Sequence, residues 1–343
     1  MALMTKLHRA LALGVLGTAM VLGPFAQGGI FDDTNAINAA AVAATNEFCH
    51  PVGVVSGLKD GVWYVASTGT LIESNIVMCA AHQLPSGYYS AVRFTLRNPL
   101  DNSIVVREYA DWWSCHPNYA GLEYVKREKD VALFHLTNAI TAINPAKRYR
   151  GQDVCGTPVV TVGFGDPAVA GSTNPHFYDG VKRVGTNVTR WFGSYANYWW
   201  TDDFICTEFN PGTWQGFYHD SGGPWFVNVN GEMQVAAITA MVYPAYSREY
   251  GAVTGATRVS VVNGWIDRVI SSFYPVLTVV RVDASRVKIS WPSPTPGFVL
   301  QQSADPSATT SWEAVSVAPS DDGTNKSVIV TAAARSQFWR LFK

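Results

Sequence analysis

The chain has 343 residues and carries 25 lysines and arginines against 26 aspartates and glutamates, so its formal charge is −1. Because 48% of the residues are hydrophobic and only 15% are charged, the composition excludes intrinsic disorder over most of the chain. The balanced charge, with no basic run, gives no support to nucleic acid or an anionic membrane as a partner. A neutral substrate or a protein substrate remains open.

The first 28 residues have the pattern of a secretory signal peptide. Lys6 and Arg9 precede an apolar stretch over 10–22, and small residues over 26–28 form a cleavage site. The apolar stretch is shorter than the roughly 20 residues that a membrane-spanning helix needs. We therefore expect cleavage near Gly28, export to the periplasm or the medium, and no membrane anchor in the mature chain.

Residues 29–50 are interpreted as a leader segment that packs on a main domain over 51–274. From residue 51 the pattern changes to short β-branched and aromatic runs separated by turn residues, which predicts many short strands. The expected strands cover 52–55, 62–67, 91–96, 103–109, 131–136, 159–164, 225–229 and 234–240. Asn230-Gly231 predicts a tight hairpin between the last two. Many strands with few helices favour an all-β barrel or sandwich over βαβ units.

One helix is expected near the end of the main domain, over 264–271 with Asn263 as its N-cap. Beyond residue 274 the composition shifts, and 275–343 is predicted to form a small β-sandwich module punctuated by proline and Asp-Gly turns. The module has neither histidine nor cysteine, so no catalytic chemistry is assigned to it.

The tryptophans of this module leave two interpretations open. Exposed rings would suit contact with a carbohydrate or a cell surface. Rings packed in the core are the commoner use of tryptophan, and this second interpretation is favoured. The residues concerned are Trp291, Trp312 and Trp339.

Five cysteines would enter an oxidising compartment: Cys49, Cys79, Cys115, Cys155 and Cys206. An odd number leaves at least one thiol unpaired, and the pairing of the others cannot be deduced from spacing. The Cys-His dipeptides at 49–50 and 115–116 lack the further ligand spacing of a zinc site. No metal or other cofactor is predicted.

The most informative motif is His-Asp-Ser-Gly-Gly-Pro at 219–224. A serine hydroxyl is a weak nucleophile without a base, and the glycines allow a turn that presents Oγ together with backbone N–H donors. Three more motifs accompany it in chain order: Gly-Thr-Leu-Ile at 69–72, Cys-Ala-Ala-His at 79–82 and Asp-Val-Ala-Leu at 130–133. Together they predict a serine nucleophile served by a histidine and an aspartate.

In these motifs, and in His-Pro-Asn-Tyr at 116–119, the chain from about 51 to 272 resembles the trypsin/chymotrypsin-like serine endopeptidases. The resemblance implies two six-stranded β-barrels with the site between them. It implies Ser221 as nucleophile, His82 as general base and then acid, and Asp130 as the carboxylate that orients His82. The C-terminal module resembles the small β-sandwich appendages of secreted bacterial enzymes.

The same resemblance assigns roles to residues around the nucleophile. The backbone N–H groups of His219 and Ser221 would form the oxyanion hole, and Asp220 would pair with an N-terminus freed by activation cleavage. The substrate pocket would include Gln215 and the segment Ala240, Met241 and Val242. The expected substrate is a protein or peptide.

Several residues depart from the family pattern. The usual activation sequence is absent, so the partner of Asp220 stays open, and the customary cysteines beside His82 and Ser221 are missing. Gln215 has no negative charge and Val242 would narrow the pocket, which favours cleavage after small or uncharged residues. His219 stands where the family has glycine, and His219→Gly is expected to maintain or raise turnover unless the imidazole itself contacts substrate or holds the loop.

Two alternatives were weighed against an active endopeptidase. An α/β-hydrolase needs Gly-x-Ser-x-Gly and the order Ser, acid, His, and this chain has neither. A catalytically silent homologue that binds partners through the same cleft is the more serious rival, because His219 occupies the oxyanion position. The active enzyme is favoured, since every triad member is present.

Overall fold

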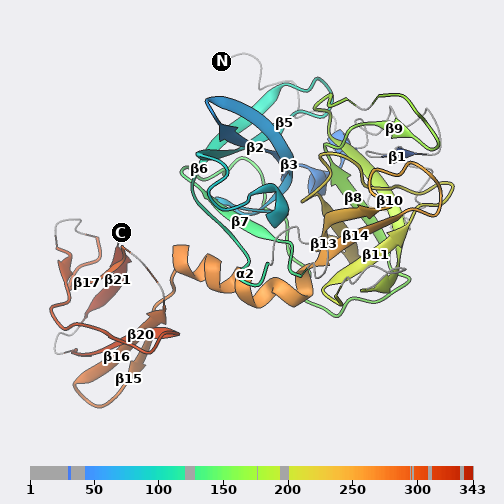
Figure 1. Cartoon of the computed structure of the whole chain (residues 1–343). Helices are drawn as coiled ribbons and strands as arrows, with labels where there is room; N and C mark the ends of the chain where they lie inside the picture. The colour runs from blue at the N-terminus through green and yellow to red at the C-terminus, as the bar shows by residue number, and fades with distance from the viewer. Residues whose placement is uncertain are drawn as a thin grey trace, which may run out of the picture.

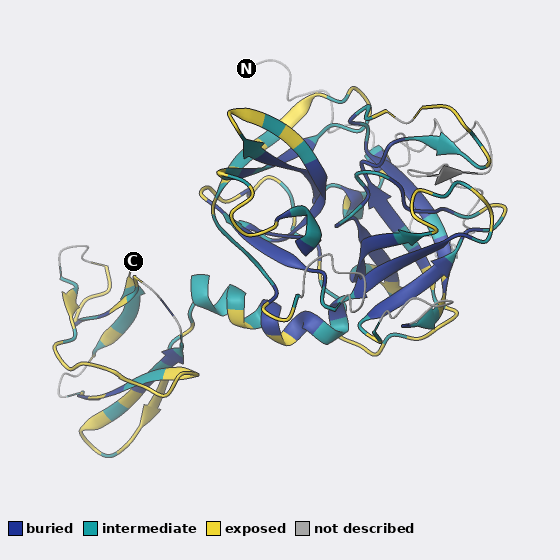
Figure 2. Cartoon of the chain, viewed as in Figure 1, coloured by how far each residue is buried: buried dark blue, intermediate teal, exposed yellow. Residues whose placement is uncertain are grey.

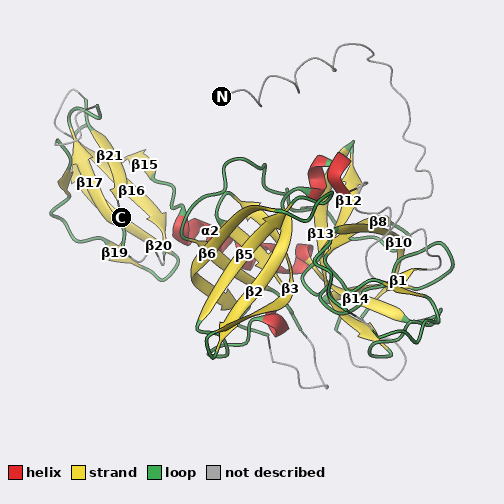
Figure 3. Cartoon of the chain, turned by 90° about the horizontal axis from the view of Figure 1, so that it is seen from above, coloured by secondary structure: helices red, strands yellow, loops and turns green. Residues whose placement is uncertain are grey.

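The computed structural model describes residues 30–31, 43–119, 128–175, 177–193, 201–293, 295, 297–307, 311–332 and 336–342. The signal peptide predicted over 1–28 lies outside these residues, as does most of the leader. Among the described residues, no helix is long and apolar enough to cross a membrane. Strands make up most of the regular structure, which Figure 3 shows in a view from above.

Six antiparallel strands close the first barrel in the order β2-β3-β4-β7-β6-β5. They are β2 (Val52–Lys59), β3 (Val62–Glu73), β4 (Ile76–Cys79), β5 (Ala91–Arg97), β6 (Ile104–Cys115) and β7 (Ala132–Leu136). The interior is filled by side chains such as Leu71, Phe94 and Phe134, all fully buried. The 3₁₀ turn η3 (Ala81–Gln83) follows β4 directly.

A second closed barrel has the order β10-β11-β14-β13-β12-β8. Its strands are β8 (Pro158–Gly163), β10 (Arg183–Phe192), β11 (Phe204–Glu208), β12 (Pro224–Val229), β13 (Glu232–Tyr243) and β14 (Val253–Arg258). The predicted hairpin joins β12 to β13, where Asn230 and Gly231 both take positive φ, 52° and 90°. Outside the barrel, β1 (Ile30–Phe31) pairs in parallel with β9 (Ala168–Val169).

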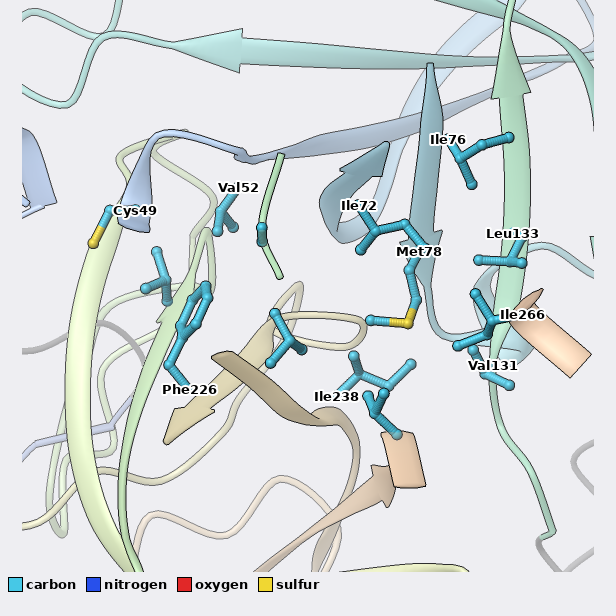
Figure 4. Close-up of a cluster of buried hydrophobic side chains, with 14 of the residues drawn as sticks. Cys49, Val52, Ile72, Ile76, Met78, Val131, Leu133, Phe226, Ile238 and Ile266 are labelled. Atoms are coloured by element: carbon cyan, nitrogen blue, oxygen red, sulfur yellow. The ribbon is translucent and has the colours of Figure 1, made fainter. Parts of the chain in front are cut away.

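The two barrels and the helix α2 (Val259–Phe273) share one apolar core. Figure 4 shows Ile72 and Met78 from the first barrel facing Ile238 from the second, with Ile266 of α2 beside them. Each Å² of apolar surface removed from water contributes about 25 cal/mol, so this continuous cluster holds the two barrels against each other. The shared core therefore sets how the two barrels lie against each other.

The start of α2 differs from the expectation. The helix begins at Val259, after Arg258, so Asn263 lies inside it and is not its N-cap. Instead the Asn263 side chain is nearly buried, where Nδ2 donates to Tyr149 O (2.9 Å) and Oδ1 accepts from Arg148 (2.9 Å). The amide was interpreted as a cap because its tertiary partners are 114 and 115 residues away in sequence.

Beyond α2 the chain forms two small sheets with the orders β15-β16-β20-β19 and β18-β17-β21. Their strands are β15 (Thr278–Arg281), β16 (Arg286–Pro292), β17 (Val299–Ser303), β18 (Glu313–Ala314), β19 (Ser320–Asp321), β20 (Asn325–Thr331) and β21 (Phe338–Phe342). Figure 1 shows this module at the far end of α2, set apart from the barrels, and Figure 2 shows how much of it is exposed.

The tryptophans of the module are used in different ways. Trp291 is 3% exposed in the core with Ile289 and Leu300, and Trp339 packs half-buried against the same cluster. Trp312 is also half-buried, with the Arg340 guanidinium 4.2 Å from its ring centroid. Contact of this module with a carbohydrate or a surface stays a prediction.

The all-β class, the double six-stranded barrel, the C-terminal helix and the appended β-sandwich are confirmed. Four barrel strands were missed by sequence reasoning: β4, β10, β11 and β14. Most of the strands that were expected extend further in the structure. The boundary predicted at 274 falls between the end of α2 and the start of β15, and the independence of the two parts stays a prediction.

Candidate active site

Strand pairing brings His82 and Asp130 together from positions 48 residues apart in sequence. β4 and β7 are neighbours, with Cys79 opposite Ala132, so the turn after one strand and the residues before the other meet at the same barrel end. His82 lies in η3, and Asp130 lies two residues before β7. Ser221 comes from the second barrel, in the turn before β12.

These three side chains form a continuous chain of contacts. Asp130 Oδ2 lies 2.7 Å from His82 Nδ1, and Asp130 Oδ1 accepts from the His82 backbone N–H at 2.9 Å. On the other side of the ring, His82 Nε2 lies 3.0 Å from Ser221 Oγ. With the proton on Nδ1 bound by the carboxylate, Nε2 is free to accept the serine proton. Asp130 is 1% exposed, so water does not compete for it.

The turn that carries Ser221 has a demanding backbone. Gly222 has φ 80°, and a Cβ at that position would lie 2.3 Å from Thr68 O. The turn is held by Thr68 N–H donating to Ser221 O (3.0 Å) and by Gly222 N–H donating to Thr239 O (2.7 Å). Only glycine fits this close approach of two backbones.

Two backbone donors in this turn are left for a substrate. Within the described part of the chain, no protein acceptor takes the N–H of His219 or the N–H of Ser221. His219 reaches this geometry with φ 67°, in the left-handed region that a residue with a Cβ seldom occupies. These are the two N–H groups that the family resemblance assigns to the oxyanion hole.

Asp220 lies fully buried behind the same turn. Its Oδ1 accepts from Gly165 N–H and its Oδ2 from Phe217 N–H, each at 3.0 Å. Among the described residues no cation lies within ion-pair distance of it, and burial raises its pKa to about 7. Gly165 must be glycine, because a Cβ there would lie 2.1 Å from Asp220 Oδ2.

A cavity of about 420 Å³ opens beside Ser221. Ala240, Met241 and Val242 line it as expected, together with His82 and His219. None of the described residues that line it is an aspartate, glutamate, lysine or arginine. The surface offered to a substrate is therefore largely apolar and aromatic, with polar groups from Gln83, Ser221, Thr239 and the two imidazoles.

The structure does not bring Gln215 to this cavity. Its side chain is fully buried, and Nε2 donates to Ser247 O at 2.8 Å. Next to it, Gly216 N–H donates to Thr254 Oγ1 at 3.0 Å, so the Thr254 side chain covers the backbone that follows Gln215. Sequence reasoning missed Thr254. Only the pairing of β14 with β13 shows that it lies opposite Val242, which lines the cavity.

Two further residues of the site were also missed. Thr68 Oγ1 donates to His219 O at 2.8 Å, and Asp166 Oδ1 lies 2.7 Å from His219 Nδ1. Thr68 belongs to β3, directly before Gly-Thr-Leu-Ile at 69–72, and Asp166 follows β8; no role was assigned to either side chain from the sequence. Their positions could be found only once the barrels were assembled.

The five cysteines are free thiols, and the described structure pairs none of them. Cys49, Cys79 and Cys206 are buried, Cys115 is half-buried and Cys155 is exposed. Burial raises the pKa of Cys49 to about 12 and that of Cys115 to about 11, so both thiols are protonated at neutral pH.

Similarity to known proteins decides the family. The family model described as Trypsin matches residues 41–266, well over half of the chain. This chain belongs to the trypsin family. It is similar to "Chymotrypsin-like elastase family member 1" of Macaca fascicularis, with 26% identity over 63% of this chain and 82% of the relative. The Rattus norvegicus protein of that name is 26% identical over 70% and 92%, and that of Felis catus 27% over 63% and 82%.

Membership of the trypsin family confirms the resemblance seen in the motifs. The protein is therefore a member of a family of serine proteases, with the double barrel that carries their site. The appended module lies outside the matched region, which ends at residue 266 within α2.

Proposed function

We propose that this protein is an active serine endopeptidase and that His82, Asp130 and Ser221 are its catalytic residues. The observation that carries the proposal is the unbroken chain of contacts from Asp130 through His82 to Ser221 Oγ. A nucleophile, a base within hydrogen-bond reach and a group that orients the base are the three parts that acyl transfer requires.

The steps follow from this geometry. His82 Nε2 takes the proton of Ser221 Oγ as the oxygen attacks the carbonyl carbon of the scissile bond. The negative charge that develops on the carbonyl oxygen is stabilised by the N–H groups of His219 and Ser221. The imidazolium, stabilised by Asp130, then gives its proton to the leaving amine. A water molecule, deprotonated by His82, attacks the acyl-enzyme ester and releases the second product.

The substrate class proposed is a protein or peptide cleaved after a small or uncharged residue. No aspartate, glutamate, lysine or arginine is among the described residues that line the cavity beside Ser221, and Gln215 lies buried outside it. An arginine or lysine side chain would lose its hydration there without a carboxylate to pair with.

Export is part of the proposal. The basic start, the apolar stretch over 10–22 and the small residues over 26–28 support a signal peptide that is removed before the enzyme acts. The expected location is extracellular or periplasmic.

A silent homologue that only binds partners is the second candidate function. It is favoured by one observation, the presence of His219 with a left-handed φ where the family resemblance expects glycine. Such a protein would retain the cleft but would not react at Ser221.

Covalent labelling separates the two functions. The signal-free protein, residues 29–343, is treated with a fluorophosphonate probe and assayed on casein. We expect labelling at Ser221, and in Ser221→Ala a fall in turnover on the order of 10⁶. Ser90→Ala is the matched control, because Ser90 is exposed and its hydroxyl donates to Leu58 O (3.1 Å) and not to a triad member. Unlabelled Ser221 in a folded protein, or undiminished casein hydrolysis by Ser221→Ala, would contradict the assignment.

A further inference from the structure

A second histidine–aspartate pair lies beside the catalytic one. His219 Nδ1 is 2.7 Å from Asp166 Oδ1, and the Asp166 side chain is only 1% exposed. The Tyr178 ring packs edge-on against the imidazole, with 4.9 Å between ring centroids. The His219 side chain is therefore fixed by a buried carboxylate on one side and an aromatic ring on the other.

This pair acts on a residue whose backbone is strained. His219 has φ 67°, a conformation in which the Cβ of an L-residue crowds the following carbonyl oxygen. Without an external restraint, such a residue relaxes toward negative φ. That rotation would turn the peptide unit and move the His219 N–H away from the position where the substrate oxyanion forms.

The surrounding contacts join the segment after β8 to the turn over 218–221, which carries the N–H groups of His219 and Ser221 and is named the oxyanion turn. Asp166 N–H donates to Tyr218 O at 3.0 Å, and Gly165 N–H donates to Asp220 Oδ1 at 3.0 Å. Thr68 Oγ1 accepts from Phe164 N–H at 3.0 Å and donates to His219 O at 2.8 Å. The carbonyl of His219 and its imidazole are thus both held, by Thr68 and Asp166.

None of these contacts involves a chain terminus. The family resemblance gives the task of ordering this turn to a freed N-terminus paired with Asp220, whereas here Asp220 is bound by two backbone N–H groups. The side chains that restrain the turn, Thr68 and Asp166, both belong to the barrel framework. A restraint built in this way is present as soon as the barrels fold.

We propose that Asp166 and His219 are positioning residues. Through their side chains they hold the turn so that the His219 N–H points to the oxyanion position, and the oxyanion hole forms without an N-terminus released by cleavage. The inference rests on the proposed function for its catalytic consequence. The pair itself takes no part in bond making, and its effect passes through the backbone of residue 219.

The test uses residues 29–343 with the N-terminus verified by mass spectrometry. Acylation by p-nitrophenyl acetate and by a fluorophosphonate is measured for the parent, Asp166→Ala, Asp166→Asn and Asp166→Ala/His219→Gly. The parent should acylate with its N-terminus uncleaved. Asp166→Ala should acylate about 10²- to 10³-fold more slowly, the range for one lost oxyanion donor, with the loss in kcat rather than in KM.

The other two variants separate positioning from general damage. In Asp166→Asn the amide oxygen still accepts from Nδ1–H, so most of the rate should return. In Asp166→Ala/His219→Gly the turn takes a positive φ without a restraint, so the double variant should be faster than Asp166→Ala. The matched control is Asp111→Ala, which removes a similar pair on the first barrel, Asp111 with His135 at 2.6 Å, and should leave acylation unchanged.

A crystal structure of Asp166→Ala keeps this inference apart from the proposed function. Residue 219 should move to negative φ in that variant. If Ser221 fails to react in the parent and in every variant, the proposed endopeptidase function is wrong. The φ angle of residue 219 in the crystal structure still decides the role of Asp166. A retained positive φ, an unchanged acylation rate in Asp166→Ala, or activity that appears only after N-terminal cleavage would each overturn the inference.

Discussion

Asp220 is the residue whose burial has the clearest effect on stability. Its carboxyl group is fully enclosed, and burial outweighs the two backbone N–H donors and raises its pKa from 3.8 to about 7. Between pH 3.8 and about 7, the Asp220 carboxyl group therefore keeps its proton in the folded protein and loses it in the unfolded chain.

The sign of the resulting pH dependence follows directly. The contribution of Asp220 to the free energy of unfolding is fully present below about pH 4 and is lost progressively as the pH rises to about 7. Above that pH it does not change further. In urea unfolding from pH 4 to 8, the unfolding free energy of the parent should fall relative to that of Asp220→Asn as the pH rises to about 7. A difference independent of pH would show that Asp220 ionises normally in the folded protein.

Gly165 limits the space around the same carboxylate. In Gly165→Ala the new Cβ would lie 2.1 Å from Asp220 Oδ2, so either the backbone after β8 or the oxyanion turn must shift. We expect a loss of about 1–3 kcal/mol in unfolding free energy, together with slower acylation, because the turn and this segment are joined. Chemical denaturation and ester hydrolysis measure the two effects, and normal values for both would contradict the crowding.

The prediction for His219→Gly needs Asp166 beside it. The sequence favours maintained turnover because of the backbone cost of a Cβ, and leaves open a direct role for the His219 side chain. The contact with Asp166 corresponds to the alternative kept open there, in which the imidazole holds the loop. The single glycine variant would also remove the imidazole partner of a buried carboxylate, so it is informative mainly together with Asp166→Ala.

At the scale of single elements, α2 joins the parts of the molecule. Its buried face carries Val259, Val262 and Ile266 into the core shared by the barrels, and its last turn stacks Phe273 on His135 with 4.2 Å between centroids. Helical packing, more than intrinsic propensity, therefore sets where this helix begins and ends.

Gly264 offers a direct test of propensity in this helix. It is exposed, and a Cβ there would meet only Arg268, at 3.8 Å. Gly264→Ala should raise the unfolding free energy by about 0.5–1 kcal/mol, since alanine loses less backbone entropy in a helix. It is also the matched control for Gly165→Ala, because both add one methyl group. A destabilised Gly264→Ala protein would mean that α2 is not a regular helix at this point.

At the scale of the whole molecule, the appended module has its own small core. Ile289, Trp291 and Leu300 are buried with residues of the same module, and nothing in this cluster belongs to a barrel. The barrels likewise complete their own cores with α2. The two parts therefore have the features of separate folding units.

Truncation after Tyr274 tests this independence. The shortened protein should stay folded and keep its activity on small peptides, because the helix and both barrels are intact. Circular dichroism melting and peptide hydrolysis, compared with the longer chain, check the prediction. An insoluble or inert product would place 275–343 within the catalytic unit.

The sequence by itself determined the fold class and the family, and it predicted the candidate catalytic residues. Alternating β-branched runs predicted strands, and four short motifs in order predicted a serine, histidine and aspartate site in a trypsin-like double barrel. These signals are local, since each depends on residues close together in the chain. Strands such as β4 and β11 escaped because nearly all of their residues are buried, so they show no alternation.

Only the tertiary structure decided which other residues surround the reacting atoms. Asp166 reaches His219 across 53 residues of sequence and Thr68 reaches it across 151. Gln215 does not line the cavity and bonds instead to Ser247, between β13 and β14. Closing a barrel brings together residues from distant strands according to strand order and register, and a single sequence carries no local signal of either. The restraint on the oxyanion turn is for this reason a property of the folded protein alone.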